Sequence, residues 1–437
     1  MSKGKQKDSR NHHKRPTAPA GFVLFVAAAL VAWGLVKPAK GGHETRWTVF
    51  IVAGRSGAVP SRRPVEALLG EKVDLYPVVA RRRGGTTTYF SQAKAFRSGG
   101  TRLACVPFGR LSSGKPRGSG SSLGFRWYQV EPYGQHKKLK SPNKGDPTYA
   151  NAVLMGPRHG KWLGFDRLEY FESPIKGAKK ARWTVTKASP SKHRSGRGAG
   201  TMRYKVSVRI KGRWLSSPGV QAVGSRGIKK SVIRVSFRHK DDFVGHVSSY
   251  FNVPYVFGSA GSEARHQTDL YTGTDCADVL VGGARRAGAK VPYTSAAGLK
   301  RYTTRVSSPL LMTRQGFFVY DGGKKGKRAR LRFGREVKRG DMMLINYVGF
   351  NGTPRGWDHV GVLVADQGVK GRLDPKDSFY HMGLRNGLLE AAVGSEGPAV
   401  VQFLRWKKRY LKQMTRHVKK LKKERRHGQP HQPVQKL

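Results

Sequence analysis

The segment GTDCADVLVGGARRAG, residues 273–288, restricts the fold most, because it predicts one sharply bounded helix in a stretch otherwise rich in strand signals. Thr274 or Asp275 is a natural N-cap, since a short polar side chain can accept from the first backbone N–H groups. Gly288 ends the helix, and Pro292 prevents it from continuing. A helix that precedes antiparallel strands is the order of an α+β domain, so we expect that fold class.

Strand signals follow this helix. They are DMMLINY (341–347), HVGVLVA (359–365), SFYHM (378–382) and LLEAAV (388–393). Short apolar runs of this kind are typical of strands that pair in one sheet. We therefore place an α+β domain at residues 241–404, in which the helix packs on an antiparallel sheet.

Residues 43–240 consist of strand signals separated by basic linkers rich in glycine and serine. Strands are expected at 46–53, 72–79, 125–131, 182–187 and 202–210. The last is the clearest, with Met202, Tyr204, Val206, Val208 and Ile210 on one face and Arg203, Lys205, Ser207 and Arg209 on the other. We expect a β-rich accessory region of one or two sandwich- or barrel-like domains.

The amino terminus combines a basic segment, residues 1–20, with the apolar run GFVLFVAAALVAWGLV at residues 21–36. This order is typical of an export signal or a signal anchor. No small-x-small motif follows the run, which favours an uncleaved membrane anchor over a cleaved peptide; a buried core helix is the remaining alternative. We expect a single-pass protein of the cell membrane, with the bulk of the chain on the periplasmic or extracellular side.

Residues 405–437 form a basic tail. It contains an apolar stripe at helical spacing, made of Leu411, Met414, Val418 and Leu421. Two interpretations stay open: a solvated helix that caps the preceding domain, and an amphipathic segment that lies on an anionic surface.

The net charge is +58, from 84 Lys and Arg residues against 26 Asp and Glu residues. Such a charge predicts attraction to polyanions, which include nucleic acid, anionic lipid and the anionic polymers of a cell wall. The chain has 2 cysteines, Cys105 and Cys276, which excludes a disulfide scaffold and a cysteine-rich zinc module. We expect no metal site and no cofactor, because the histidines near the two termini lack partners at ligand spacing.

Cys276 falls in the first turn of the expected helix, where unpaired N–H groups stabilise a thiolate. For a lone helix cysteine, the plainer interpretation is a small core residue. His359 opens an apolar strand after a loop rich in glycine and proline and is the candidate base. His381, on the adjacent expected strand, is the leading candidate for the group that orients the imidazole.

Five short motifs occur in order in this region: VPYVFG (253–258), TDCADVL (274–280), VPYTSAAG (291–298), GDMMLI (340–345) and HVGVLV (359–364). Together they resemble the signature segments of the NlpC family of papain-like cell-wall cysteine peptidases. The resemblance covers about residues 246–404.

The resemblance implies a papain-like α+β fold, with the cysteine on a helix packed on an antiparallel sheet that carries the histidine. It implies Cys276 as nucleophile, His359 as base and Tyr255 as a hydrogen-bonding residue of the active site. Ala277 and Asp278 replace the family's usual Ser-Gly, which leaves the substrate contacts open. The third catalytic residue is His381 or, by a second alignment of the last strand, Glu390.

These observations predict a membrane-anchored cysteine hydrolase that cuts amide bonds of peptidoglycan stem peptides by a Cys-His-His mechanism. The partners expected are peptidoglycan or another anionic envelope polymer, and the membrane through residues 21–36. Nucleic acid is the less favoured partner, because no nucleic-acid motif is recognised. The alternatives are a papain-like amidase, acyltransferase or deamidase on another substrate, and a polyanion-binding envelope protein without catalysis.

Overall fold

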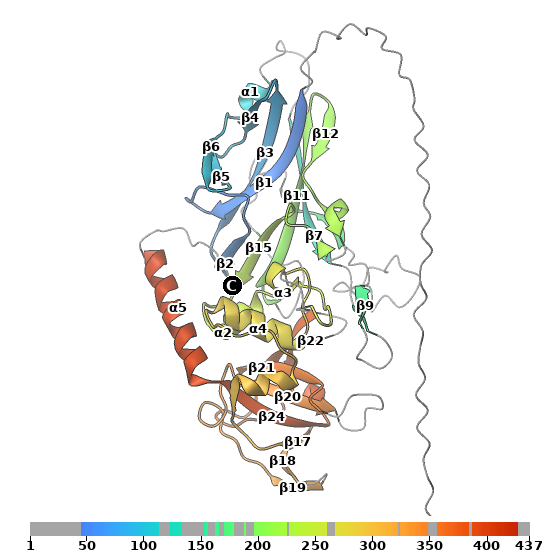
Figure 1. Cartoon of the computed structure of the whole chain (residues 1–437), viewed down its shortest axis with the longest axis vertical. Coiled ribbons are helices and arrows are strands. Elements are labelled where there is room, and N and C mark those ends of the chain that lie inside the picture. Colours follow the sequence, from blue (N-terminus) through green and yellow to red (C-terminus); the bar gives the residue numbers. More distant parts are fainter. Residues whose placement is uncertain are drawn as a thin grey trace, which may run out of the picture. The chain divides into compact units, whose positions relative to one another are not determined.

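Strands dominate the computed structural model, and short helices lie among several sheets (Figure 1). The structure describes residues 45–112, 123–132, 153–155, 162–165, 170–178, 188, 196–224, 227–259, 267–321, 324–347, 356–383 and 387–426. These residues belong to one compact unit, Thr45–Leu437. The expected anchor at 21–36 and the expected strand at 182–187 lie outside them. Within the described ranges, no helix is both long enough and apolar enough to cross a bilayer.

Two larger sheets organise the first half of this unit and share one core, beside smaller two-stranded sheets. The first has the order β1-β3-β4, with β1 (Arg46–Arg55), β3 (Val73–Arg83) and β4 (Thr86–Phe90). The second has the order β10-β7-β11-β15-β2, with β12 on β11; its strands are β10 (Tyr170–Pro174), β7 (Gly124–Pro132), β11 (Gly200–Ile210), β15 (Ile233–Arg238), β2 (Val65–Leu68) and β12 (Arg213–Ser216). Apolar side chains of β1, β3, β11 and β15 pack together between the sheets.

Shorter elements connect these strands. They are β5 (Ala95–Ser98), β6 (Thr101–Ala104), α1 (Gly109–Ser112), β8 (Val153–Met155), β9 (Trp162–Phe165), η2 (Val220–Ala222), β13 (Val223–Gly224) and β14 (Gly227–Ile228). The two-stranded sheets are β5-β6, β8-β9 and β13-β14.

Strand β11 follows the expected alternation on its apolar face, where every second residue from Met202 to Ile210 is buried. The opposite face differs from the expectation, because Arg203 and Ser207 are also buried. The Arg203 guanidinium donates to the backbone oxygen of Tyr271 at 2.5 Å. A polar residue on this face is therefore covered by the C-terminal half of the chain rather than by water.

One nine-stranded antiparallel sheet organises the second half, in the order β19-β18-β17-β24-β20-β21-β22-β23, with β16 on β24. Four strands match the expected ones: β20 (Met342–Tyr347), β21 (His359–Ala365), β22 (Ser378–Gly383) and β23 (Gly387–Ala392). The others are β16 (Thr303–Arg305), β17 (Leu310–Thr313), β18 (Gly316–Asp321), β19 (Lys324–Arg328) and β24 (Ala399–Trp406).

Helix α4 (Cys276–Arg286) packs on β21 and β22 and against α2 (Phe243–Ser248). The side chains of this helix layer and the near face of the sheet form one core, while a separate cluster covers the other face. A Cβ added to Gly283 would lie 2.5 Å from Val247 Cγ2, so glycine allows the two helices to approach closely. The remaining helical turns are α3 (Gln267–Leu270), η3 (Ala297–Arg301) and η4 (Val393–Glu396).

The basic tail begins as helix α5 (Lys408–Arg426) directly after β24. Met414 and Leu421 of its apolar stripe are buried in the protein, whereas Val418 is half-buried and Leu411 is exposed. This packing favours the interpretation of the tail as a helix that caps the domain.

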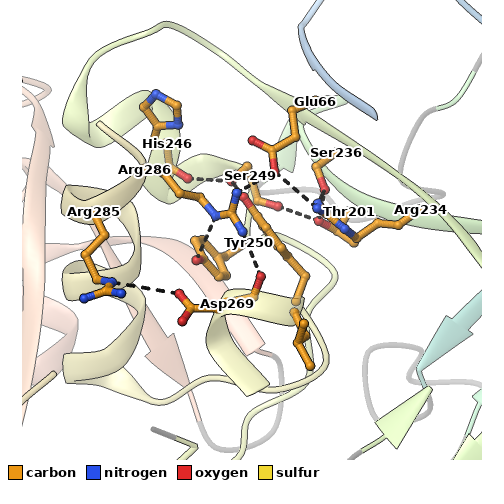
Figure 2. Close-up of polar contacts among 12 residues, drawn as sticks. Glu66, Thr201, Arg234, Ser236, His246, Ser249, Tyr250, Asp269, Arg285 and Arg286 are labelled. Carbon is orange, nitrogen blue, oxygen red and sulfur yellow. Dashed lines mark hydrogen bonds and ion pairs between the residues drawn. The ribbon is translucent and has the colours of Figure 1, made fainter. Parts of the chain in front are cut away.

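A buried network of charges joins the two halves of the unit (Figure 2). Glu66 of β2 accepts from Arg286 of α4 at 2.5 Å and from Arg234 of β15 at 3.2 Å. Both guanidinium groups also lie over the ring of Tyr271, at 4.2 and 4.1 Å from its centroid. The last turn of α4 is thereby fixed to the accessory sheet.

Candidate active site

Cys276 is the first residue of α4, and its neighbour Asp275 fixes that position. The Asp275 carboxylate accepts from the backbone N–H groups of Ala277 and Asp278 at 3.0 and 2.8 Å. It also accepts from the backbone N–H of Gly258 at 3.0 Å. Asp275 is thus the N-cap expected from the sequence, and it ties the helix start to the preceding loop.

The groups around the Cys276 sulfur have opposing effects on the pKa of its thiol. Burial and the carboxylates of Asp275 and Asp278 raise the pKa of the thiol above its usual value, while backbone N–H groups of Val360 and Ala277 oppose this rise. The sequence predicted a thiolate favoured by the helix start, whereas the surroundings of the sulfur in the structure favour the protonated thiol. The physical reason is that Asp275 occupies the N-terminal N–H groups and, with Asp278, adds negative charge.

Two histidines meet beside the helix start. Strand β21 begins at His359, and Gly361 pairs with His381 of β22, so the two imidazoles share one face of the sheet. His359 Nε2 lies 3.0 Å from His381 Nδ1, with one nitrogen donating to the other. Since the next residue, Val360, directs its N–H to the Cys276 sulfur, the start of β21 lies against the thiol.

Burial and the neighbouring His381 lower the pKa of His359 to about 3, so the imidazole is neutral near pH 7. A neutral imidazole can accept a proton, but a pKa of about 3 makes His359 a weak base in the uncomplexed protein. The surroundings of Cys276 likewise do not favour a thiolate formed in advance.

Glu396 and Tyr347 extend the polar chain beyond the histidines. Glu396 Oε1 lies 3.6 Å from His381 Nε2, and the Tyr347 hydroxyl donates to the other oxygen of Glu396. Phe379 stacks on the His381 ring, with centroids 4.6 Å apart, and Tyr347 stacks near His359, with centroids 6.3 Å apart. The ring of His381 is therefore held by stacking on one side and by polar contacts at both nitrogens.

The structure does not bring Glu390 to this site. Glu390 pairs with Tyr380 in the β22–β23 register, one residue from His381, so its side chain lies on the opposite face of the sheet. There it forms an ion pair with Arg197 at 3.2 Å. Between the two residues that the sequence nominated to orient His359, only His381 contacts it.

Tyr255 lies near the start of α4. It forms a β-bridge with Thr274, and burial together with Cys276, Asp275 and Asp278 raises the pKa of its hydroxyl. Asp278 accepts from the Ser259 hydroxyl at 2.6 Å in a buried position.

His359, His381 and Glu396 are also the residues in this site that could hold a metal ion, since one ligand atom of each lies within 4.8 Å of the others. A 3.0 Å hydrogen bond joins the two rings through His359 Nε2 and His381 Nδ1. The arrangement described is therefore a hydrogen-bonded chain.

The sequence did not indicate Glu396 or Tyr347. Tyr347 ends an expected strand that pairs with β21, so its closeness to His359 could have been inferred from that pairing. Glu396 lies in the irregular turn η4, where no periodic pattern marks a position.

No family model matches this chain, and comparison with the curated proteins and with the solved structures found no match.

Proposed function

We propose that the protein is a cysteine hydrolase of the cell envelope that cuts amide bonds in peptidoglycan stem peptides. One observation carries the proposal: a helix-start cysteine faces the first residues of the strand that begins with His359, whose ring lies 3.0 Å from His381. The orienting group therefore contacts the base, and the backbone next to the base lies against the nucleophile, which is the arrangement on which the proposal of acyl transfer rests. The ordered NlpC-like motifs supply the substrate class.

In the proposed mechanism, the Cys276 sulfur attacks the carbonyl carbon of the scissile amide while neutral His359 accepts the thiol proton. The backbone N–H of Cys276 stabilises the oxyanion in part. The imidazolium then gives its proton to the leaving amine, and an acyl thioester remains. Water, deprotonated by His359, releases the acid and restores the thiol.

His381 holds one tautomer and one orientation of His359 in this mechanism. Glu396 faces the far nitrogen of His381 at 3.6 Å and stabilises the positive charge that forms on the histidine pair. The Tyr347 hydroxyl orients Glu396 by donating to its second oxygen.

The proposal includes an NlpC-type fold for residues 241–404 and a membrane anchor at 21–36, which places the enzyme outside the cytoplasm. The β-rich accessory region would then position the enzyme on the wall.

The test is digestion of isolated sacculi by the purified full chain, with analysis of the released peptides. The Cys276→Ala variant should release none, whereas Cys105→Ala, which removes the other thiol, should match the wild type. Equal release by the wild type and Cys276→Ala would refute the proposal. The identity of the products separates a hydrolase from a related acyltransferase or deamidase.

A second candidate function is polyanion binding without catalysis. The raised pKa of the Cys276 thiol and the net charge of +58 favour it, because a protonated thiol is a poor nucleophile and the charge alone attracts polyanions. Alkylation by iodoacetamide at neutral pH distinguishes the two. If Cys276 fails to react while sacculi still bind, the binding function is supported.

A further inference from the structure

Helix α5 has two contrasting faces. Tyr410, Met414 and Leu421 point into the protein and are 4%, 6% and 2% exposed. The opposite face carries a row of exposed cations one helical turn apart, at i, i+4, i+8 and i+11: Lys408, Lys412, Arg416 and Lys419. We call these four residues the basic row.

The inward face is fixed to the protein along the helix. Gln413 accepts from the backbone N–H of Lys290 at 2.9 Å, and Arg425 donates to the carboxylate of Asp241. Arg425 also lies 3.5 Å from Glu71. Because the buried part of the apolar stripe is already covered, α5 as described cannot insert that face into a bilayer.

The stability of helix α5 does not account for the four cations of the basic row. The first turn of α5 contains no acidic residue, and cations there oppose the helix dipole. Lys408 and Lys412, and Lys412 and Arg416, are like charges at i, i+4, which repel each other. A surface helix selected for stability alone would alternate the signs of these charges.

We propose that the basic row is a docking surface for a linear phosphodiester polymer of the cell envelope. This inference rests on the proposed function, since it names the partner that would hold the enzyme at its substrate. A rise of about 1.5 Å per residue places the four cations along roughly 16 Å of one helix face. A chain that carries a phosphate in every short repeat can contact each of them, and contact releases its counterions.

The same face argues against single-stranded nucleic acid as the partner. Proteins that bind single strands combine cations with aromatic side chains on which the bases stack. The aromatic side chain of α5, Tyr410, is buried. The basic row therefore offers charge without a stacking surface, which suits a polymer that has no bases.

The test measures binding of poly(glycerol phosphate) to the full chain carrying Cys276→Ala, over a range of salt concentrations. Four changes to glutamine remove the basic row: Lys408→Gln, Lys412→Gln, Arg416→Gln and Lys419→Gln. We expect affinity to fall by roughly tenfold or more at moderate salt, and the slope of log affinity against log salt to flatten by about 3.

The matched control removes four charges from the exposed strand β19: Lys324→Gln, Lys325→Gln, Lys327→Gln and Arg328→Gln. This control should lose much less affinity. Equal losses in the two variants would overturn the proposal, because charge alone would then account for binding. Tighter binding of a single-stranded oligonucleotide or of anionic phospholipid vesicles through the basic row would overturn it too.

The outcome is separable from that of the proposed function. With Cys276 present, removal of the basic row should leave hydrolysis of a soluble stem peptide unchanged, since α5 contributes no residue to the histidine site. Loss of sacculus cleavage in the Cys276→Ala variant tests the proposed hydrolysis. Binding of poly(glycerol phosphate) tests the proposed role of the basic row.

Discussion

Replacement of Glu66 by glutamine should strongly destabilise the fold, because it removes the carboxylate charge between the largely buried guanidinium groups of Arg286 and Arg234. Glu66 accepts from Arg286 at 2.5 Å and from Arg234 at 3.2 Å, and the three side chains are 14%, 20% and 10% exposed. Arg286, Arg234 and neighbouring cations hold the pKa of Glu66 far below its usual value against the opposing effect of burial. Glutamine keeps the shape and removes the charge.

Breaking a buried ion pair typically costs about 3–5 kcal/mol, since the remaining charge is left uncompensated. Arg286 would keep its bond to the backbone oxygen of Asp269, and Arg234 would keep Ser236. We therefore expect the lower end of the range, about 3 kcal/mol, for Glu66→Gln.

Glu390→Gln is the matched control, because it makes the same chemical change in an ion pair whose partner, Arg197, is 65% exposed. Exposed pairs contribute about 0–1 kcal/mol. Urea unfolding of the full chain, followed by tryptophan fluorescence, measures both variants. Equal losses of unfolding free energy in the two variants, or a loss below about 1 kcal/mol for Glu66→Gln, would refute the argument that buried charge holds the two halves of the unit together.

Three further outcomes are expected. Gly283→Ala should lower the urea midpoint although alanine favours helices by about 1 kcal/mol, because the new Cβ would lie 2.5 Å from Val247 Cγ2; an unchanged or higher midpoint would contradict this. Burial and neighbouring cations lower the pKa of His246 well below 6.5. Below about pH 6.5, His246 is therefore protonated in the unfolded chain but not in the native state. Stability should fall as pH drops below about 6.5, by up to about 1.4 kcal/mol per unit, and His246→Gln should flatten that slope in pH-dependent urea titrations. Glu396→Gln should lower kcat about tenfold with little change in KM, because the contact to His381 matters once the pair is charged; an unchanged kcat in peptide-release kinetics would exclude this role.

Local signals predicted much of the fold around the site. Asp275, Gly288 and the short apolar runs after the helix define elements through nearby residues, and α4 and β20 to β23 occur where expected. The same pairing of strands places His381 beside His359.

What the sequence did not reveal depends on contacts between distant segments. Strand β24 was missed because its residues are buried on both faces, which removes the alternation that marks a strand. Arg203 is buried by Tyr271, a residue far along the chain. The raised thiol pKa depends on burial and on the direction of carboxylates, neither of which spacing alone encodes.

The place of β24 in the sheet has a consequence for biosynthesis. It lies between β17 and β20, yet it is made after the strands that carry both histidines. Until β24 emerges, the hairpins on either side expose unpaired edges that can join other chains. The sheet is therefore incomplete during synthesis, and β20, the neighbour of the strand that begins at His359, gains its other neighbour only when this late strand is inserted.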